Sequence, residues 1–274
     1  MPRRPLVFAL GILTLLLSAA GVSAAGLLVP RGGGEPIAVR SHRVVAVVED
    51  GLARTMLRQT FVNPGSQPLE AVYVFPLPEG AALTSVAMET GGRRFEGLLV
   101  ERKQARRIYD DIVRARRDPA LVEQVGRDTF RLSVFPVLPR VETVVELTWI
   151  ERLPLARGVW RYVYPLWLAG GATETEKDFT ISVTVRSSAP LSGVSSPLSD
   201  MEVVLRHPGE AVASLERVRA KLDRDVVVEA RVAVREPTLS VSTFRGAGGD
   251  GWFLAVVTPP EARPEDLIPR DVIL

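Results

Sequence analysis

Two adjacent carboxylates, Asp110 and Asp111, stand among arginines in the most charged stretch of the chain. Paired carboxylates can provide general acid–base catalysis, but this chemistry requires a pKa shifted by burial or by a second ionised carboxyl group. Arg106 and Arg114 flank Asp110 at four residues' distance, and Arg107 precedes Asp111 by the same spacing. Such cations favour the ionised carboxylate. We therefore interpret the pair as a solvated helix face rather than a catalytic site.

Histidine chemistry is limited to His42 and His207, and neither lies in a nucleophile or metal-ligand motif. An isolated histidine without clustered ligands rarely marks a metal or catalytic site, so we expect both to be surface or turn residues. The chain has no cysteine, which excludes disulfides, thiolate nucleophiles and cysteine-based zinc sites. The run from Asp223 to Asp225 could contact calcium, but calcium sites gather about six to eight oxygens, and a turn explains it better.

Four tryptophans could form a platform for a carbohydrate or a protein partner: Trp149, Trp160, Trp167 and Trp252. Aromatic strand residues more commonly pack between layers. We therefore expect core or half-buried positions, with Trp160 and Trp167 as the candidates if a binding face exists. We assign no catalytic, cofactor-binding or metal-ligating residue and expect no cofactor.

Charge excludes nucleic acid as the expected partner. The chain has 34 Lys and Arg against 32 Asp and Glu, and removing Arg3 and Arg4 leaves 32 of each. Phosphate binding depends on clustered basic residues that release counterions, and a balanced chain lacks that excess.

The N-terminal segment has the order of a secretory signal, with two arginines, an apolar run and small residues near Ala24. We expect cleavage after Ala24, so that residues 1–24 are a signal peptide. The alternative is an uncleaved membrane tether through residues 6–29, because about 20 apolar residues can cross a bilayer. Both interpretations place the rest of the chain outside the cytoplasm, as a periplasmic, cell-surface or secreted protein.

Period-two patterns and turn residues predict a mainly β chain. Expected strands before the arginine-rich segment are Val39 to Glu49, Ala53 to Val62, Leu69 to Phe75, Leu83 to Glu89 and Arg93 to Val100. The turn sequences EDG and TGG predict two hairpins among them. Later strands are expected at Thr129 to Phe135, Val141 to Ile150, Phe179 to Arg186, Met201 to Arg206, Val226 to Val234, Leu239 to Phe244 and Trp252 to Thr258.

One helix is predicted inside the arginine-rich segment. Its apolar residues recur at helical spacing along one face: Ala105, Ile108, Tyr109, Ile112 and Val113. We expect this stripe to pack on a sheet, with Pro119 ending the helix and a further short turn through Leu121 and Val122. The stretch from Gly209 to Asp225 is interpreted as one or two helical turns.

Several blocks of residues resemble the vault-protein and inter-alpha-trypsin (VIT) domain. The first block contains Asn63, Pro64, Glu70, Tyr73, Phe75, Pro76 and Leu77. The second contains Ala105, Tyr109, Asp118, Pro119, Ala120, Leu121, Phe130, Val134, Phe135 and Pro136. The later part resembles the β-rich segment that joins a VIT domain to a von Willebrand type A domain in secreted bacterial proteins.

The resemblance implies a β-sandwich-like VIT domain with one principal packed α-helix, followed by a second β-rich segment. We expect a flexible lead-in at 25–40, the VIT domain at 41–165, the connecting segment at 166–264 and the start of a type A domain at 265–274. The sequence stops at Leu274, before the DxSxS metal motif of a type A domain, so we expect a truncated member of the family.

The resemblance also implies a non-catalytic interaction or scaffold module of a cell-envelope or secreted protein. Its expected partner is another protein or the missing type A domain. The alternatives are a secreted hydrolase with an unrecognised carboxylate site, and a membrane-tethered fragment without independent activity.

Overall fold

The computed structural model describes residues 26–97, 121–124, 129–166, 173–175, 177–222, 224–233, 238–245 and 250–258. Every regular element within these ranges is a β-strand. The predicted helix with Asp110 and Asp111 lies outside the described residues. The expectation of a mainly β chain is confirmed, whereas the described part contains no helix.

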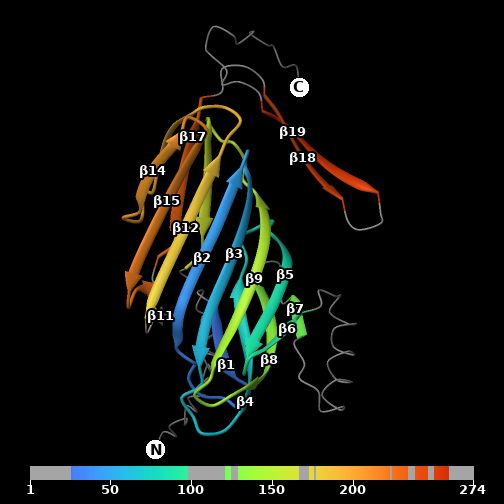
Figure 1. Cartoon of the computed structure of the whole chain (residues 1–274), viewed down its shortest axis with the longest axis vertical. Helices are drawn as coiled ribbons and strands as arrows, with labels where there is room; N and C mark the ends of the chain where they lie inside the picture. Colours follow the sequence, from blue (N-terminus) through green and yellow to red (C-terminus); the bar gives the residue numbers. More distant parts are fainter. Residues whose placement is uncertain are drawn as a thin grey trace, which may run out of the picture.

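An eight-stranded sheet runs the length of the molecule (Figure 1). In spatial order it comprises β14 (Glu202–His207), β15 (Glu210–Val218), β12 (Asp178–Arg186), β2 (Val39–Glu49), β3 (Leu52–Val62), β9 (Glu142–Arg152), β5 (Ala82–Thr90) and β6 (Arg93–Glu96). All pairings are antiparallel except that between β2 and β12, which is parallel. The expected segments 41–165 and 166–264 therefore share one sheet.

Two smaller sheets cover one face of this large sheet. The four-stranded sheet orders β1 (Leu27–Pro30), β4 (Leu69–Pro76), β8 (Thr129–Val137) and β7 (Leu121–Gln124). The three-stranded sheet orders β10 (Val159–Tyr164), β17 (Val226–Val232) and β13 (Leu191–Ser195). Two further pairs join β11 (Thr173–Glu174) to β16 (Lys221–Leu222), and β18 (Thr238–Arg245) to β19 (Gly251–Thr258).

Alternation of side chains explains why the large sheet has one covered and one open face. In β2, His42, Val44, Ala46 and Val48 are buried, whereas Arg43, Val45 and Glu49 are exposed. A strand with period-two alternation buries one row and leaves the other in water. The buried rows and the smaller sheets form one continuous hydrophobic cluster that includes Phe61, Tyr73, Trp149 and Val228.

Both predicted hairpins are confirmed. β2 pairs with β3 across Asp50 and Gly51, and β5 pairs with β6 across Gly91 and Gly92. Asp50 and Gly51 have φ of 45° and 81°, and positive φ at both central residues is typical of the tight turns that match the twist of paired strands.

Three local predictions were wrong. The segment Glu210–Val218 is strand β15 rather than helical turns, because alternate residues Ala211 and Ala213 are buried beside β12. Leu121–Gln124 is strand β7, since it pairs with the edge of β8. The expected flexible lead-in contains β1, which adds to β4 and buries Leu28. Unsatisfied hydrogen-bonding groups on neighbouring strands favour these pairings over local preference.

Candidate interaction surfaces

A buried polar chain crosses the interface between the large sheet and both smaller sheets. His42 Nε2 lies 2.7 Å from the Tyr164 hydroxyl, and its Nδ1 lies 3.0 Å from Gln59 Nε2. The Tyr73 hydroxyl donates to Gln59 Oε1. Since an amide nitrogen can only donate, His42 Nδ1 accepts and Nε2 carries the proton.

This chain corrects the prediction that His42 is a surface or turn residue. Its exposed fraction is 1%, and burial lowers the pKa of His42 to about 3. The imidazole is therefore neutral at physiological pH. Its hydrogen bonds join β2 to β3 and β10, and Gln59 extends the chain to β4. Its partners come from distant parts of the sequence, so the residues around His42 in the sequence do not indicate this role. His207 is exposed, as predicted.

Among the described residues, Glu151 is a buried carboxylate on the covered face of β9. Its exposed fraction is 7%, and burial raises its pKa to about 7. The neighbouring indole N–H of Trp149 acts in the opposite direction and offsets part of this rise, although neither Glu151 Oε1 nor Trp149 Nε1 has a hydrogen bond of good geometry within the described residues. A raised carboxyl pKa can indicate an acid–base site. No group of three or more His, Cys, Asp or Glu side chains suited to a metal occurs in the described ranges.

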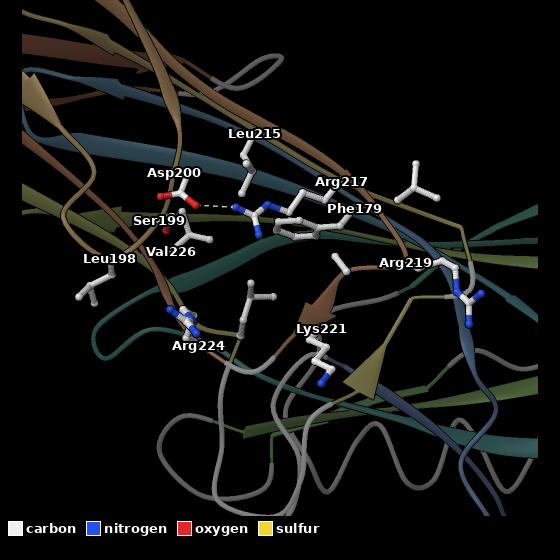
Figure 2. A pocket seen from close by; sticks show the side chains of 13 residues that line it. Phe179, Leu198, Ser199, Asp200, Leu215, Arg217, Arg219, Lys221, Arg224 and Val226 are labelled. Carbon is white, nitrogen blue, oxygen red and sulfur yellow. Dashed lines mark hydrogen bonds and ion pairs between the residues drawn. The ribbon is translucent and has the colours of Figure 1, made fainter.

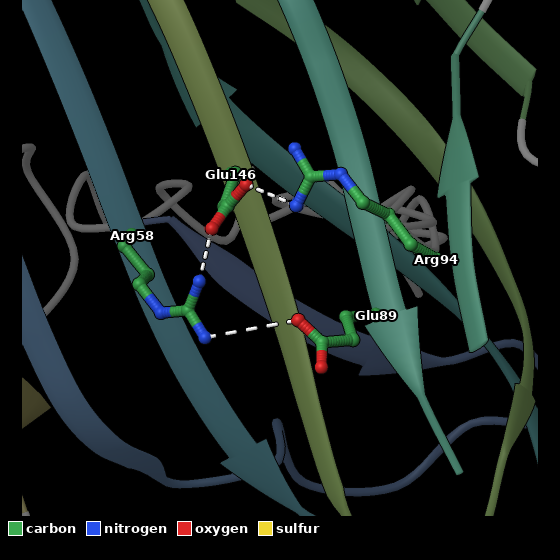
Figure 3. Close-up of polar contacts among 4 residues, drawn as sticks. All are labelled: Arg58, Glu89, Arg94 and Glu146. Atoms are coloured by element: carbon green, nitrogen blue, oxygen red, sulfur yellow. Dashed lines mark hydrogen bonds and ion pairs between the residues drawn. The ribbon is translucent and has the colours of Figure 1, made fainter. Parts of the chain in front are cut away.

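The open face of the large sheet carries a four-residue ionic cluster (Figure 3). Glu146 of β9 binds Arg58 of β3 through one carboxylate oxygen and Arg94 of β6 through the other, the latter at 2.5 Å. Glu89 of β5 lies 3.8 Å from Arg58. Partial burial alone would raise the pKa of Glu146, but the hydrogen bond and charge of Arg94, with those of Arg58, outweigh it and lower the pKa.

The ionic cluster therefore fastens strands together rather than providing an acid–base group. An exposed pair of this kind contributes about 0.2–1 kcal/mol.

Two apolar side chains on the same open face, Val45 and Met56, are cross-strand neighbours and are 43% and 48% exposed. Isolated exposed apolar residues are ordinary on soluble proteins and do not define a binding site.

The β18–β19 hairpin carries more exposed large apolar side chains than any other strand pair of the described structure, and it extends away from the other sheets (Figure 1). The register places Leu239 opposite Val257 and Val241 opposite Ala255, with Phe253 on the same face. Directly opposed residues in an antiparallel pair share a face. Phe253 is 76% exposed and Val257 is 68% exposed.

The hairpin corrects one tryptophan prediction and leaves another untested. Trp252 on β19 is 73% exposed, whereas core positions were expected for all four tryptophans. Trp149 and Trp160 are buried, as predicted. Trp167 lies outside the described residues. A two-stranded ribbon is marginally stable alone, so the exposed apolar face is suited to packing against another protein surface.

A hollow of about 530 Å³ lies among the start of β12, the end of β15 and the start of β17 (Figure 2). Apolar residues such as Phe179 and Leu215 line it together with Arg217, Lys221 and Arg224.

The run from Asp223 to Asp225, which was interpreted as a turn, is described in part. Asp223 is outside the described residues, and Asp225 accepts a hydrogen bond from the backbone N–H of Leu166 at 2.9 Å. The described part of the chain contains no helix long and apolar enough to cross a membrane.

Family comparison identifies the part of the chain that runs from β2 into β9. The model of the vault protein inter-alpha-trypsin domain matches residues 39–149. These residues form a VIT domain. The match begins at the first residue of β2 and ends within β9, so it includes most of the large sheet and three strands of the four-stranded sheet.

Three relatives contain sequence similar to this VIT domain and its surroundings. Protein mono-ADP-ribosyltransferase PARP4 of Mus musculus is 28% identical over 47% of this chain and 7% of its own length. The von Willebrand factor A domain-containing protein 5A of Rattus norvegicus is 24% identical over 69% of this chain and 23% of its own. Inter-alpha-trypsin inhibitor heavy chain H4 of Sus scrofa is 30% identical over 45% of this chain and 14% of its own.

The chain thus spans less than a quarter of the length of each of these relatives. Among solved structures, an M1 zinc metallopeptidase from Deinococcus radiodurans covers 85% of this chain and 50% of its own at 11% identity, with a TM-score of 0.40. A likeness of that degree supports no inference about the activity of this protein.

Proposed function

We propose that this protein is an exported, non-catalytic interaction module in which the β18–β19 hairpin docks a von Willebrand type A domain. The observation that carries the proposal is the apolar hairpin face formed by Leu239, Val241, Phe253, Ala255 and Val257. Apolar surface that is buried on association favours binding by about 25 cal/mol per Å² before the costs of association. Exposed aromatic residues are the usual anchors of such contacts.

The choice of partner is supported by the relatives. The Rattus norvegicus relative is named for its von Willebrand factor A domain and matches over 69% of this chain, a longer stretch than the VIT domain itself. A domain that accompanies the VIT domain in one chain would find the hairpin at high effective concentration.

The non-catalytic part of the proposal rests on the arrangement of ionisable groups. Glu151 is a single carboxylate within the core, and the ionic cluster around Glu146 holds its carboxylate ionised. Acid–base catalysis uses groups that face a substrate space and that have complementary pKa values.

The export part of the proposal rests on the apolar N-terminal segment. N-terminal sequencing of the mature protein should begin at Ala25 rather than Met1.

The docking experiment titrates the purified chain with a von Willebrand type A domain from the same source, supplied as a separate protein. Titration calorimetry measures the affinity, and the backbone amides of β18 and β19 should gain protection from hydrogen exchange when the hairpin is covered. Phe253→Ser should weaken binding by at least about tenfold, as expected for an aromatic anchor.

The matched control is Val45→Ser, which removes an exposed apolar side chain from the open face of the large sheet. Val45→Ser should leave the affinity unchanged. Equal binding by the Phe253→Ser variant and the native protein, or unchanged exchange in β18 and β19 at saturating type A domain, would refute docking through the hairpin.

A further inference from the structure

The hollow in Figure 2 combines a cationic rim with an apolar wall. Its wall includes Phe179 and Val226, which are 2% and 3% exposed, and its volume is about 530 Å³. Volumes of about 300–1,000 Å³ are typical of small-molecule sites. Leu198 and Val218 also line it and remain 50% and 74% exposed, so apolar surface continues to the mouth.

Arg217 occupies a position that strand alternation assigns to the covered face. In β15, Ala211 and Ala213 are buried, Leu215 is half-buried and Arg217 follows in the same row. Phe179 of β12 is directly opposite Arg217. The Arg217 side chain therefore lies beside the Phe179 ring, at the exposed end of β15 (Figure 2).

The side chains that line the hollow carry more positive than negative charge. Arg217, Arg219, Lys221 and Arg224 line it, and Asp200 is the single carboxylate among the described lining residues. Asp200 accepts a hydrogen bond from Arg217 at 2.9 Å. Its side chain is 95% exposed, so the carboxylate lies at the solvent end of the hollow and a competing anion could displace it from Arg217.

A second observation at the same place concerns Ser199. Its hydroxyl oxygen is buried and has no hydrogen-bond partner within the described structure. Buried hydroxyl groups are normally satisfied, and one left without a partner beside cations is suited to donate to a bound anion.

We propose that this hollow binds an amphiphile with one carboxylate head and an unbranched apolar chain, as in a medium-chain fatty acid. The carboxylate replaces Asp200 on Arg217 and accepts a hydrogen bond from Ser199, and Lys221 adds positive charge to the rim. The apolar chain lies against Phe179 and Leu215. A guanidinium–carboxylate pair beside a low-dielectric wall is stronger than the same pair in water.

The experiment measures binding of octanoate, octanol and octylammonium to the full chain by titration calorimetry at low ionic strength. We expect octanoate to bind at least about tenfold more tightly than either of the others. Affinity should rise about threefold to fourfold per methylene from hexanoate to octanoate. Added salt should weaken binding of the carboxylates.

Variants locate the site. Arg217→Gln should weaken octanoate binding by about tenfold or more, and Lys221→Gln by a smaller factor. Asp200→Asn should strengthen it by about threefold to tenfold, because the internal competitor is removed. The matched control is Arg186→Gln, since Arg186 also pairs with an acidic residue across β12 and β15, Glu210 at 3.0 Å, but does not line the hollow.

Circular dichroism and thermal unfolding establish that each variant is folded. The proposal is overturned if octanoate binds no more tightly than octanol. It is also overturned if Arg217→Gln and Asp200→Asn change the affinity no more than Arg186→Gln does, or if Trp252→Ser alone abolishes binding, which would assign the amphiphile to the β18–β19 hairpin.

Discussion

Glu151 shows how a single side chain makes the stability of this protein depend on pH. Its pKa in the folded protein is about 7, against 4.5 for an exposed glutamate. Burial disfavours the ionised form in the folded protein but not in the unfolded chain. The unfolded chain therefore releases its proton first, and the free energy of unfolding falls as pH rises from about 4.5 to about 7.

Glu151→Gln should remove this dependence. At pH 4 the variant and the native protein should unfold with similar free energies, because the carboxyl group is then protonated in both states. At pH 8 the variant should be more stable by about 3 kcal/mol, the equivalent of the pKa difference. Urea unfolding at a series of pH values measures this. The contribution of buried His42 is common to both proteins and cancels.

A stability difference between Glu151→Gln and the native protein that stays constant across this pH range would show that Glu151 ionises normally in the folded state.

At the scale of elements, the turn between β2 and β3 sets the position of the strands that carry the buried polar chain. Gly51 has φ of 81°, and a Cβ atom there would lie 2.7 Å from Trp160 Nε1 and 3.0 Å from the Leu153 carbonyl oxygen. Both the left-handed backbone and the close approach of the three-stranded sheet require glycine at this position.

Gly51→Ala should lower the free energy of unfolding by at least about 2 kcal/mol, the sum of backbone strain and displacement of Trp160. Gly92→Ala is the matched control, because Gly92 has φ of 73° and nothing within 4 Å of an added Cβ. The control should cost only about 1 kcal/mol. Equal losses in thermal or urea unfolding would mean that Trp160 does not restrict the turn.

Strands whose apolar residues alternate could be predicted from the sequence. Strands that form because they pair with a neighbouring strand could not. β2, β12 and β17 each repeat apolar residues at a spacing that only a strand buries. β15 contains Leu215, Glu216, Arg217 and other residues that favour helices, yet hydrogen bonding to β12 makes it a strand.

The same distinction applies to the candidate sites. The strands of the β18–β19 hairpin were predicted, but the exposure of Trp252 was not, since a strand pattern does not specify what covers it. The row that ends in Arg217 could be found only once β15 was known to be a strand. His42 required the positions of Gln59 and Tyr164, which only the fold brings together.

At the scale of the whole molecule, the shared sheet joins the VIT domain to the segment that follows it. β12 pairs along its full length with β2, and one hydrophobic cluster includes residues from both parts. When two parts share a sheet and a core, one part cannot unfold without exposing the apolar surface of the other. We therefore expect one cooperative unfolding transition rather than two.

Val183→Ala tests this expectation, because Val183 on β12 is fully buried outside the VIT domain. The substitution should lower the free energy of unfolding by about 2 kcal/mol. Hydrogen exchange should show the same loss of protection in the slowest amides of β3 and of β17. Loss confined to residues 178–232 would show that the two parts unfold independently.

The parallel pairing of β2 with β12 also orders events during synthesis. Residues of the VIT domain leave the ribosome first, and until residues 178–186 emerge, one side of β2 has no strand beside it. An uncovered strand edge is a template for pairing with another chain. The nascent protein is therefore most exposed to aggregation in the interval between these two segments, and a chaperone that recognises extended backbone would act there.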